Sequence, residues 1–200
     1  PADVIAAEAT KNGIPTMSTH MNEETAKNIL KEHGKASIVT ANNVYAHVDD
    51  LAGMTNAIKT VMSKNGIFVF EVSYLLDVVE KMLIGTVFHE HLSYHSLFSL
   101  VPFLKKYNLN LIGFRYVSNV QGGAIVGIAK KSKKSKLPYR INKMIKKEIK
   151  FGITDVKGMK RFNMKFKKKI NSFKNEIFSF IGKKKIIGYG AARSAVLIID

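Results

Sequence analysis

Two strand-like runs near the middle of the chain lie too close together for a helix to join them. Residues 110–118 read NLIGFRYVS and residues 123–131 read GAIVGIAKK, with only residues 119–122 between them. A parallel crossover needs about a dozen or more residues, so the two runs should form an antiparallel hairpin. The preceding residues alternate between helical and strand-like patterns, which predicts a parallel α/β sheet that ends in this hairpin.

Residues 1–131 are therefore expected to form one α/β domain. Further strands are expected at 15–17, at 36–40, which reads as short and buried, and at 67–72, which is β-branched and aromatic. Helices are expected at 4–12, at 51–63 and at 97–107, together with one that Asn22 caps and Gly34 ends.

The last third of the chain is rich in lysine and is expected to begin with a helical connector at 132–182. Within it, five apolar residues repeat at helical spacing: Phe162, Phe166, Ile170, Phe173 and Ile177. This stripe predicts a helix that docks on a core, and a basic helix lying on anionic lipid is the alternative. Residues 183–200 should begin a new strand–turn–helix unit. Its Gly188-Tyr189-Gly190 resembles the opening of a dinucleotide-binding turn, although Arg193 replaces the third glycine.

The positive charge of the chain is confined to one segment. The net charge is +17, and residues 130–185 hold 21 Lys and Arg against 3 Asp and Glu, so the rest of the chain carries −1. The segment lacks the Gly-rich and aromatic pattern of a single-strand binder. Solvated helix faces are the favoured interpretation, and a non-catalytic binding module for nucleic acid or an anionic surface is the alternative.

Composition disfavours several classes of protein. No apolar run approaches the roughly 20 residues that span a bilayer, and no signal-peptide pattern is present. Because the chain has no cysteine, it has no disulfide or thiolate metal site, which fits a cytoplasmic protein. The chain starts at Pro1 and ends at Asp200 within an apolar run, so we expect it to be a piece of a longer protein.

The segment TVFHEHLSYHS at 86–96 concentrates side chains that can carry chemistry. It holds His89, His91 and His95 with Glu90, in a chain with 6 histidines. No regular structure aligns the three rings and the HExxH spacing is absent, so a metal site is disfavoured. A histidine beside a carboxylate can act as a general base near neutral pH. A hydrogen-bonded polar turn explains the same composition, and the cluster alone leaves both interpretations open.

Several segments together resemble one enzyme family. EVSYLLDVVEKMLIGTVFHEHLSYHS at 71–96, TANNVYAHVDDL at 40–51 and QGGAIVGIAKK at 121–131 are similar to S-adenosylmethionine-dependent C-methyltransferases that act on nucleotide-linked keto-sugars. GITDVKGMKRF at 152–162 and GYGAARSAVL at 188–197 resemble the start of that family's C-terminal domain. The resemblance implies a class I methyltransferase sheet without its first strands, followed by a helical connector and the start of a second Rossmann-like domain at 183–200.

The family pattern, carried over residue by residue, implies a catalytic base at His91. Glu90 would be its neighbouring carboxylate, and His47 would be a second polar group near the substrate. Three residues after the 36–40 strand would meet the methionine end of the cofactor: Ala41, Asn42 and Asn43. The family commonly has tyrosine where this chain has Phe88, so one hydroxyl donor is missing from the site.

The implied reaction transfers a methyl group from S-adenosylmethionine to the carbon next to the ketone of a nucleotide-linked keto-deoxysugar. His91 would remove the proton on that carbon while neighbouring donors hold the enolate oxygen. A methyltransferase that acts on another acceptor is the alternative within the same enzyme class. The nucleotide-linked keto-sugar is the expected partner, and neither a membrane nor nucleic acid is expected.

Parts of the family's enzymes are missing from this sequence. In class I methyltransferases a Gly-rich loop and an acidic residue hold the donor, and Pro1-Ala2 resembles the residues that come immediately after that acid. Zinc is expected only in the family's N-terminal module, outside this chain. We therefore expect the 200 residues to bind S-adenosylmethionine weakly or not at all, and not to turn over alone.

Overall fold

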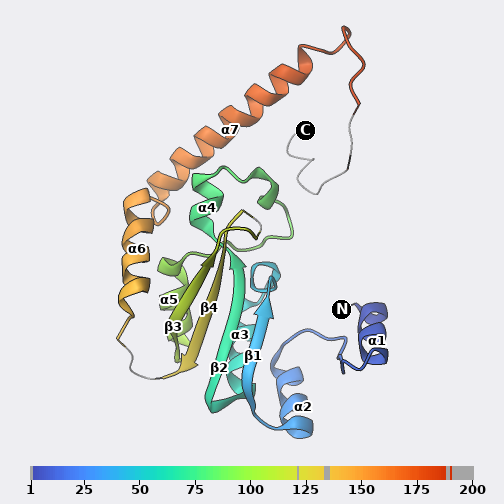
Figure 1. Cartoon of the computed structure of the whole chain (residues 1–200), viewed down its shortest axis with the longest axis vertical. Coiled ribbons are helices and arrows are strands. Elements are labelled where there is room, and N and C mark those ends of the chain that lie inside the picture. The colour runs from blue at the N-terminus through green and yellow to red at the C-terminus, as the bar shows by residue number, and fades with distance from the viewer. Residues whose placement is uncertain (1, 121, 133–135, 188–189, 191–200) are drawn as a thin grey trace.

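A mixed four-stranded sheet forms the centre of the structure (Figure 1). The computed structural model describes residues 2–120, 122–132, 136–187 and 190. The strands are β1 (Ala36–Asn42), β2 (Met62–Ser73), β3 (Leu109–Val117) and β4 (Ala124–Lys131), and their order across the sheet is β1-β2-β4-β3. β1 runs parallel to β2, whereas β4 runs antiparallel to both β2 and β3. The predicted α/β class and its closing hairpin are confirmed.

Helices surround this sheet on several sides. The α-helices are α1 (Asp3–Lys11), α2 (Glu23–His33), α3 (Leu51–Val61), α4 (Leu75–Glu80), α5 (Leu97–Lys106), α6 (Tyr139–Phe151) and α7 (Val156–Phe178), and two short 3-10 helices are η1 (Tyr45–His47) and η2 (Ile84–Thr86). α3 contacts β2 and α2, while α5 and α6 contact β3. None of the helices that the structure describes is long and apolar enough to cross a membrane.

Capping side chains define where the helices begin. Asn22 Oδ1 accepts from the main-chain N–H of Thr25 at 2.9 Å, and Gly34, with φ +73°, follows the last residue of α2. Both ends of this helix are therefore as predicted. At α5, Ser96 and Ser99 form a reciprocal capping box. The cap fixes the point at which the histidine-rich segment turns into a helix.

Three expectations about regular structure are wrong. Residues 15–17 form no strand. β1 is longer than the expected 36–40 strand and mostly exposed, with Ile38 at 61% exposure, because no described strand covers its outer edge. α3 ends at Val61, so residues 62–63 of the helix expected at 51–63 lie inside β2 instead. Gly66 lets β2 approach β1 closely, since a Cβ there would lie 2.9 Å from the carbonyl oxygen of Ala36.

Aromatic packing fixes the segment that carries His47. The ring of Tyr45 in η1 lies 5.7 Å from the rings of both Phe68 and Phe70, and all three side chains are fully buried. The Tyr45 hydroxyl also makes a hydrogen bond with Thr55 of α3. Large buried rings supply much of the free energy that holds a core together. η1 is therefore anchored to both β2 and α3.

A single buried carboxylate docks the lysine-rich α6 on the rest of the domain. Glu148 Oε1 accepts from the Tyr74 hydroxyl at 2.8 Å and from the N–H of Leu97 at 2.9 Å, and Oε2 accepts from the N–H of Phe98 at 2.8 Å. The two N–H groups belong to the first turn of α5, where no intrahelical acceptor exists. Burial raises the pKa of Tyr74, and the neighbouring Glu148 raises it further, so the hydroxyl stays a donor.

α7 departs from the sheet and extends away from it (Figure 1). α6 ends at Gly152 in the left-handed conformation, with φ +88°, and a Cβ on Gly158 would overlap the main chain of Gly152. The two helices thus meet through glycine. The expected docking of the apolar stripe on a core is wrong for the described structure, because only Ile170 of the stripe is buried and Phe173 is 45% exposed.

The boundaries expected at 1–131, 132–182 and 183–200 stay predictions. Gly188 and Tyr189 of the glycine turn, and Arg193 after it, lie outside the described residues. The connector does contain helices, α6 and α7, on either side of a short turn.

Replacing Glu148 with alanine should destabilise the fold strongly. The change leaves two buried donors and one part-buried donor without their acceptor. Each buried donor costs about 1–3 kcal/mol, so we expect a loss of about 2 kcal/mol or more in the free energy of unfolding. Urea unfolding followed by circular dichroism measures it. Glu176→Ala, at an exposed position of α7, is the control and should change stability by less than about 0.5 kcal/mol. A loss below about 1 kcal/mol for Glu148→Ala would contradict the docking role.

Candidate active site

The histidine-rich segment returns to the carboxyl end of β2. The N–H of Leu75 donates to the carbonyl of His95 at 2.9 Å, and the N–H of Ser93 donates to the carbonyl of Ala46 in η1 at 3.2 Å. Two motifs that lie far apart in the sequence therefore meet where the parallel strands β1 and β2 end. Ligands of open α/β sheets bind at this end of the strands.

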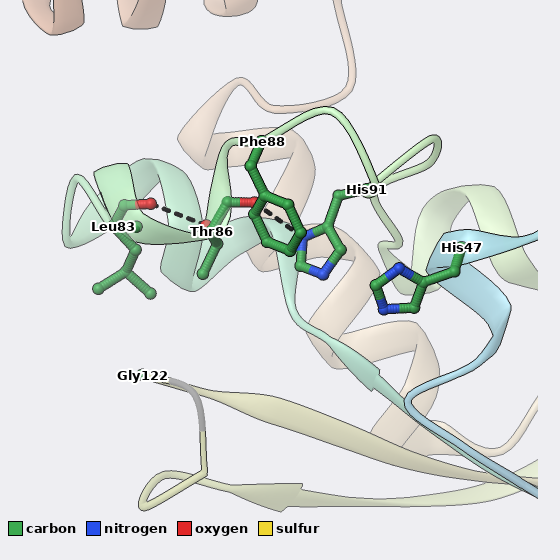
Figure 2. Close-up of a pocket in the computed structure, with 7 residues that line it drawn as sticks. His47, Leu83, Thr86, Phe88, His91 and Gly122 are labelled. Atoms are coloured by element: carbon green, nitrogen blue, oxygen red, sulfur yellow. Dashed lines mark hydrogen bonds between the residues drawn. The ribbon is translucent and has the colours of Figure 1, made fainter. Parts of the chain in front are cut away.

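A cavity of about 460 Å³ lies between these motifs and the turn that joins β3 to β4 (Figure 2). Its lining residues are His47, Leu83, Gly85, Thr86, Phe88, His91 and Gly122. The rings of His47 and His91 lie side by side, and Gly122 lies across from them (Figure 2). The described lining is aliphatic, aromatic or glycine apart from one hydroxyl and two imidazoles, which suits an uncharged ligand with apolar parts.

The main chain orients the ring of His91. Its Nδ1 lies 2.7 Å from the carbonyl oxygen of Thr86. Because a carbonyl can only accept, Nδ1 carries the hydrogen, and in the neutral ring the lone pair is then on Nε2. Nε2 points away from that carbonyl (Figure 2). Phe88 packs against the ring at a centroid distance of 4.1 Å. His91 is thus held as a proton acceptor.

His47 is held in the same way from the other motif. Its Nδ1 lies 2.9 Å from the carbonyl oxygen of Glu90, so its neutral ring also has the lone pair on Nε2. The centroids of the His47 and His91 rings are 4.8 Å apart. Each ring can therefore accept through Nε2 when it is neutral and donate through Nε2 when it is protonated.

Glu90 enters the site through its main chain. Its carbonyl accepts from His47, while its carboxylate Oε1 lies 3.9 Å from Nε2 of His89, whose side chain is 82% exposed. Glu90 as the carboxylate partner of His91 stays a prediction. His89 lies at the outer rim of the segment and is a useful control position.

The three residues expected at the cofactor have different surroundings. Asn43 adopts a left-handed conformation, with φ +52°, and both its N–H and its side-chain Nδ2 donate to Glu71 at 3.0 Å. It also lines a small cleft that contains both active-site histidines. Ala41 is buried in the core, and Asn42 is exposed. The structure therefore brings Asn43 to the site, and cofactor binding by these residues stays a prediction.

Two residues that line the cavity, Thr86 and Gly122, were not predicted as site residues from the sequence. The Thr86 carbonyl accepts from His91 and from the Tyr94 hydroxyl, the latter at 3.2 Å. Main-chain acceptors carry no residue signature, so no pattern could have marked this one. Gly122 could have been predicted from the sequence, because a glycine pair between two strand-like runs is typical of a hairpin turn. In the structure its φ is +81°.

The third histidine of the segment has a structural role. His95 is 5% exposed, and its Nε2 lies 3.1 Å from Ser93 Oγ, which in turn donates to the carbonyl of Tyr45 at 3.4 Å. Burial lowers the pKa of His95 to about 4, so the ring is neutral at neutral pH. Within the residues that the structure describes, no group of three or more His, Asp or Glu is arranged to hold a metal.

Comparison with known proteins gives two family matches. A model described as a methyltransferase domain matches residues 3–113, and one described as a C-methyltransferase C-terminal domain matches residues 119–200. The C-methyltransferase NovU of Streptomyces niveus is 31% identical over 129 residues, which cover 64% of this chain and 30% of that protein. The chain thus spans about 30% of the length of this curated relative.

Solved structures show only distant likeness. A SAM-dependent methyltransferase from Anabaena variabilis is 13% identical over 56% of each chain, with a TM-score of 0.39. The structure of M1.HpyAVI is 15% identical over 58% of this chain and 55% of its own, with a TM-score of 0.36.

Protonation of His95 should destabilise the fold in weak acid. Since its pKa is 6.5 when unfolded and about 4 when folded, the unfolded chain binds more protons between these values. The contribution of the neutral His95 ring to the free energy of unfolding is therefore complete above pH 6.5. It is lost as the pH falls toward 4, by about 3 kcal/mol in total. Urea unfolding from pH 7 to pH 5 measures this slope for the wild type and for His95→Gln.

The free energies of unfolding of the wild type and of His95→Gln should differ most at pH 7 and converge as the pH falls. His33→Gln is the control, because His33 is exposed, and its stability should follow the wild-type slope. Equal slopes for His95→Gln and the wild type would show that the buried ring does not control acid stability.

Proposed function

Because the chain belongs to the methyltransferase-domain family, whose model covers residues 3–113, we propose that it carries the catalytic centre of an S-adenosylmethionine-dependent C-methyltransferase. Three findings support this proposal. They are the match of residues 119–200 to a C-methyltransferase C-terminal domain, the identity with NovU, and the paired histidines at the carboxyl ends of β1 and β2.

The pairing of His47 and His91 is the observation that carries the proposal. Both rings donate Nδ1–H to main-chain carbonyls, and both border the same cavity. A carbon next to a ketone is a weak acid, so its proton leaves only if a base accepts it and the enolate oxygen is stabilised. One imidazole that accepts and a second that can donate supply both functions.

We assign the base to His91. Its Nε2 takes the proton from the carbon next to the acceptor ketone, the electrons of the broken C–H bond move into the enolate, and the imidazolium charge is stabilised through Nδ1–H on the Thr86 carbonyl. Phe88 packs against one side of the ring, with the two centroids 4.1 Å apart. A base held in one tautomer and one orientation needs little reorganisation during the reaction.

His47 is the candidate donor to the enolate oxygen. When protonated it keeps Nδ1–H on the Glu90 carbonyl and presents Nε2–H to the cavity. This role matters more in a chain with Phe88, because the hydroxyl that the resembling family commonly has at this position is missing. A donor aimed at a developing oxyanion typically contributes about 10²–10³-fold to the rate.

S-adenosylmethionine, when bound, supplies a methyl group on a sulfonium that a carbon nucleophile can accept. The chain offers one edge of a site for it. Asn43 and Ser73, which follow or end β1 and β2, line the cleft beside His47 and His91, so polar residues border the place that we propose for the methionine end. We propose that Asn43 lies against the donor and that Asn42 and Ala41 shape the same edge.

For the acceptor we propose a nucleotide-linked keto-deoxysugar. A cavity of about 460 Å³ accommodates a sugar ring, and its mostly apolar lining suits a deoxygenated one. The resemblance of the histidine-rich motif to keto-sugar C-methyltransferases supports this class. A ketone serves this reaction, because its carbonyl acidifies the neighbouring C–H bond, whereas an unactivated C–H bond is not acidic enough for an imidazole base.

His91→Asn should abolish most methyl transfer. Asparagine cannot accept the proton, so kcat should fall by about 10²–10⁴-fold. The measurement, made with the full-length protein, is transfer of labelled methyl from S-adenosylmethionine to a nucleotide-linked keto-sugar. His89→Asn, two residues away with an exposed side chain, is the control and should keep the wild-type rate.

A second measurement isolates proton removal. The wild type should exchange the acceptor proton next to the ketone with D₂O even without the methyl donor, and His91→Asn should not. Wild-type kcat in His91→Asn would refute the assignment of the base. Transfer to an oxygen or nitrogen of an acceptor without a ketone would show a methyltransferase of another specificity.

A further inference from the structure

Asp77 in α4 is a buried carboxylate that the proposed reaction does not use. It is 4% exposed, and its Oδ1 accepts from the hydroxyl of Tyr116 at 2.9 Å and from Nζ of Lys81 at 2.7 Å. Its Oδ2 has no hydrogen-bond partner among the residues that the structure describes. A buried charge costs free energy unless it is paired, so such a residue needs a role that balances the cost.

Lys81 connects Asp77 to the turn between β3 and β4. Its Nζ donates to the carbonyl of Gly122 as well as to Asp77, and it lies 3.3 Å from the hydroxyl of Tyr116. An ammonium group has three hydrogens, and each one has an acceptor here. The hydrogen bond to Asp77 raises the pKa of Lys81, so the lysine stays charged.

The turn itself packs tightly on this network. A Cβ at Gly123 would overlap Oδ2 of Asp77, and a Cβ at Gly122 would lie 2.5 Å from Cδ1 of Leu83. Both glycines have positive φ, +81° at Gly122 and +145° at Gly123. The carbonyl of Gly123 also accepts from the N–H of Tyr74 at 3.0 Å. The turn thus packs against the side chains of Asp77 and Leu83, and Lys81 donates a hydrogen bond to one of its carbonyls.

This turn forms the wall of the cavity that faces the two imidazoles (Figure 2). We propose that Asp77 and Lys81 are positioning residues of the active site, which hold the Gly122–Gly123 turn so that the acceptor is seated against His91 and His47. The identity of the ligand rests on the proposed function, whereas the contacts between the pair and the turn do not. Neither side chain lines the cavity, so both act through the main chain of the turn.

Lys35 provides a matched control. Its Nζ donates to the carbonyl of Thr60, so it makes the same kind of lysine-to-main-chain bond near the start of β1. Replacing either lysine with methionine keeps the length of the side chain and removes the charged donor. Only Lys81→Met should disturb the cavity wall.

The kinetic experiment compares Lys81→Met with Lys35→Met in the full chain of the enzyme. Loss of a hydrogen bond from a charged donor corresponds to roughly tenfold or more in binding, so KM for the keto-sugar should rise about tenfold in Lys81→Met. Its kcat should stay within about threefold, because His91 is unchanged. Lys81→Arg restores a charged donor and should recover part of the lost affinity. Lys35→Met should leave KM unchanged.

A readout without substrate keeps the two proposals separate. Amide hydrogen exchange at Gly123, whose N–H donates to the carbonyl of Val120 at 2.8 Å, should speed up by roughly tenfold in Lys81→Met and not in Lys35→Met. Unchanged exchange at Gly123, or a loss of stability with KM unchanged, would overturn the positioning role. If exchange is faster in Lys81→Met but the wild type transfers no methyl group, the positioning role stands and the proposed function is refuted.

Discussion

Tyr74, at the carboxyl end of β2, is the point on which the site depends. Its N–H holds the hairpin turn through Gly123, and its hydroxyl holds α6 through Glu148. The next residue, Leu75, holds the histidine-rich segment through the carbonyl of His95. Three parts of the chain from different regions of the sequence are thus fixed at two consecutive residues. The side chain is 2% exposed, so these bonds are shielded from competition with water.

Main-chain carbonyls set the orientation of two histidines, His91 and His47. The Thr86 and Glu90 carbonyls place the hydrogen of His91 and His47 on Nδ1, so in the neutral rings the lone pair is on Nε2. His95 differs in its partner, Ser93 Oγ, and in its burial, which keeps the ring neutral and makes it part of the scaffold. One short segment therefore contains an exposed histidine, a histidine that lines the cavity and a structural one. Their roles follow from the acceptor and the solvent that each ring meets.

The sequence predicted those features that follow from chain length and from local capping. The hairpin was predictable because residues 119–122 leave no room for a crossover, and α2 because Asn22 and Gly34 bound it. The early start of β2 was missed because Lys64-Asn65-Gly66 has the composition of a turn, and only pairing with β1 makes it a strand. His91 and His47 were predicted as site residues through resemblance, whereas the contacts of Glu148 and Asp77 depend on partners far along the chain. Glu148 reads in the sequence as one acid among lysines, and nothing local shows that it is buried.

The glycine contact between α6 and α7 has a mechanical consequence. α7 has 23 residues, so at a rise of about 1.5 Å per residue it is a rod of about 35 Å. A rotation of about 10° at the joint of Gly152 and Gly158 would therefore carry its far end about 6 Å. Glu148 lies one turn before that joint and fixes its near side to the sheet. The position of the far end of α7 is therefore set by the glycine contact and by the anchor at Glu148.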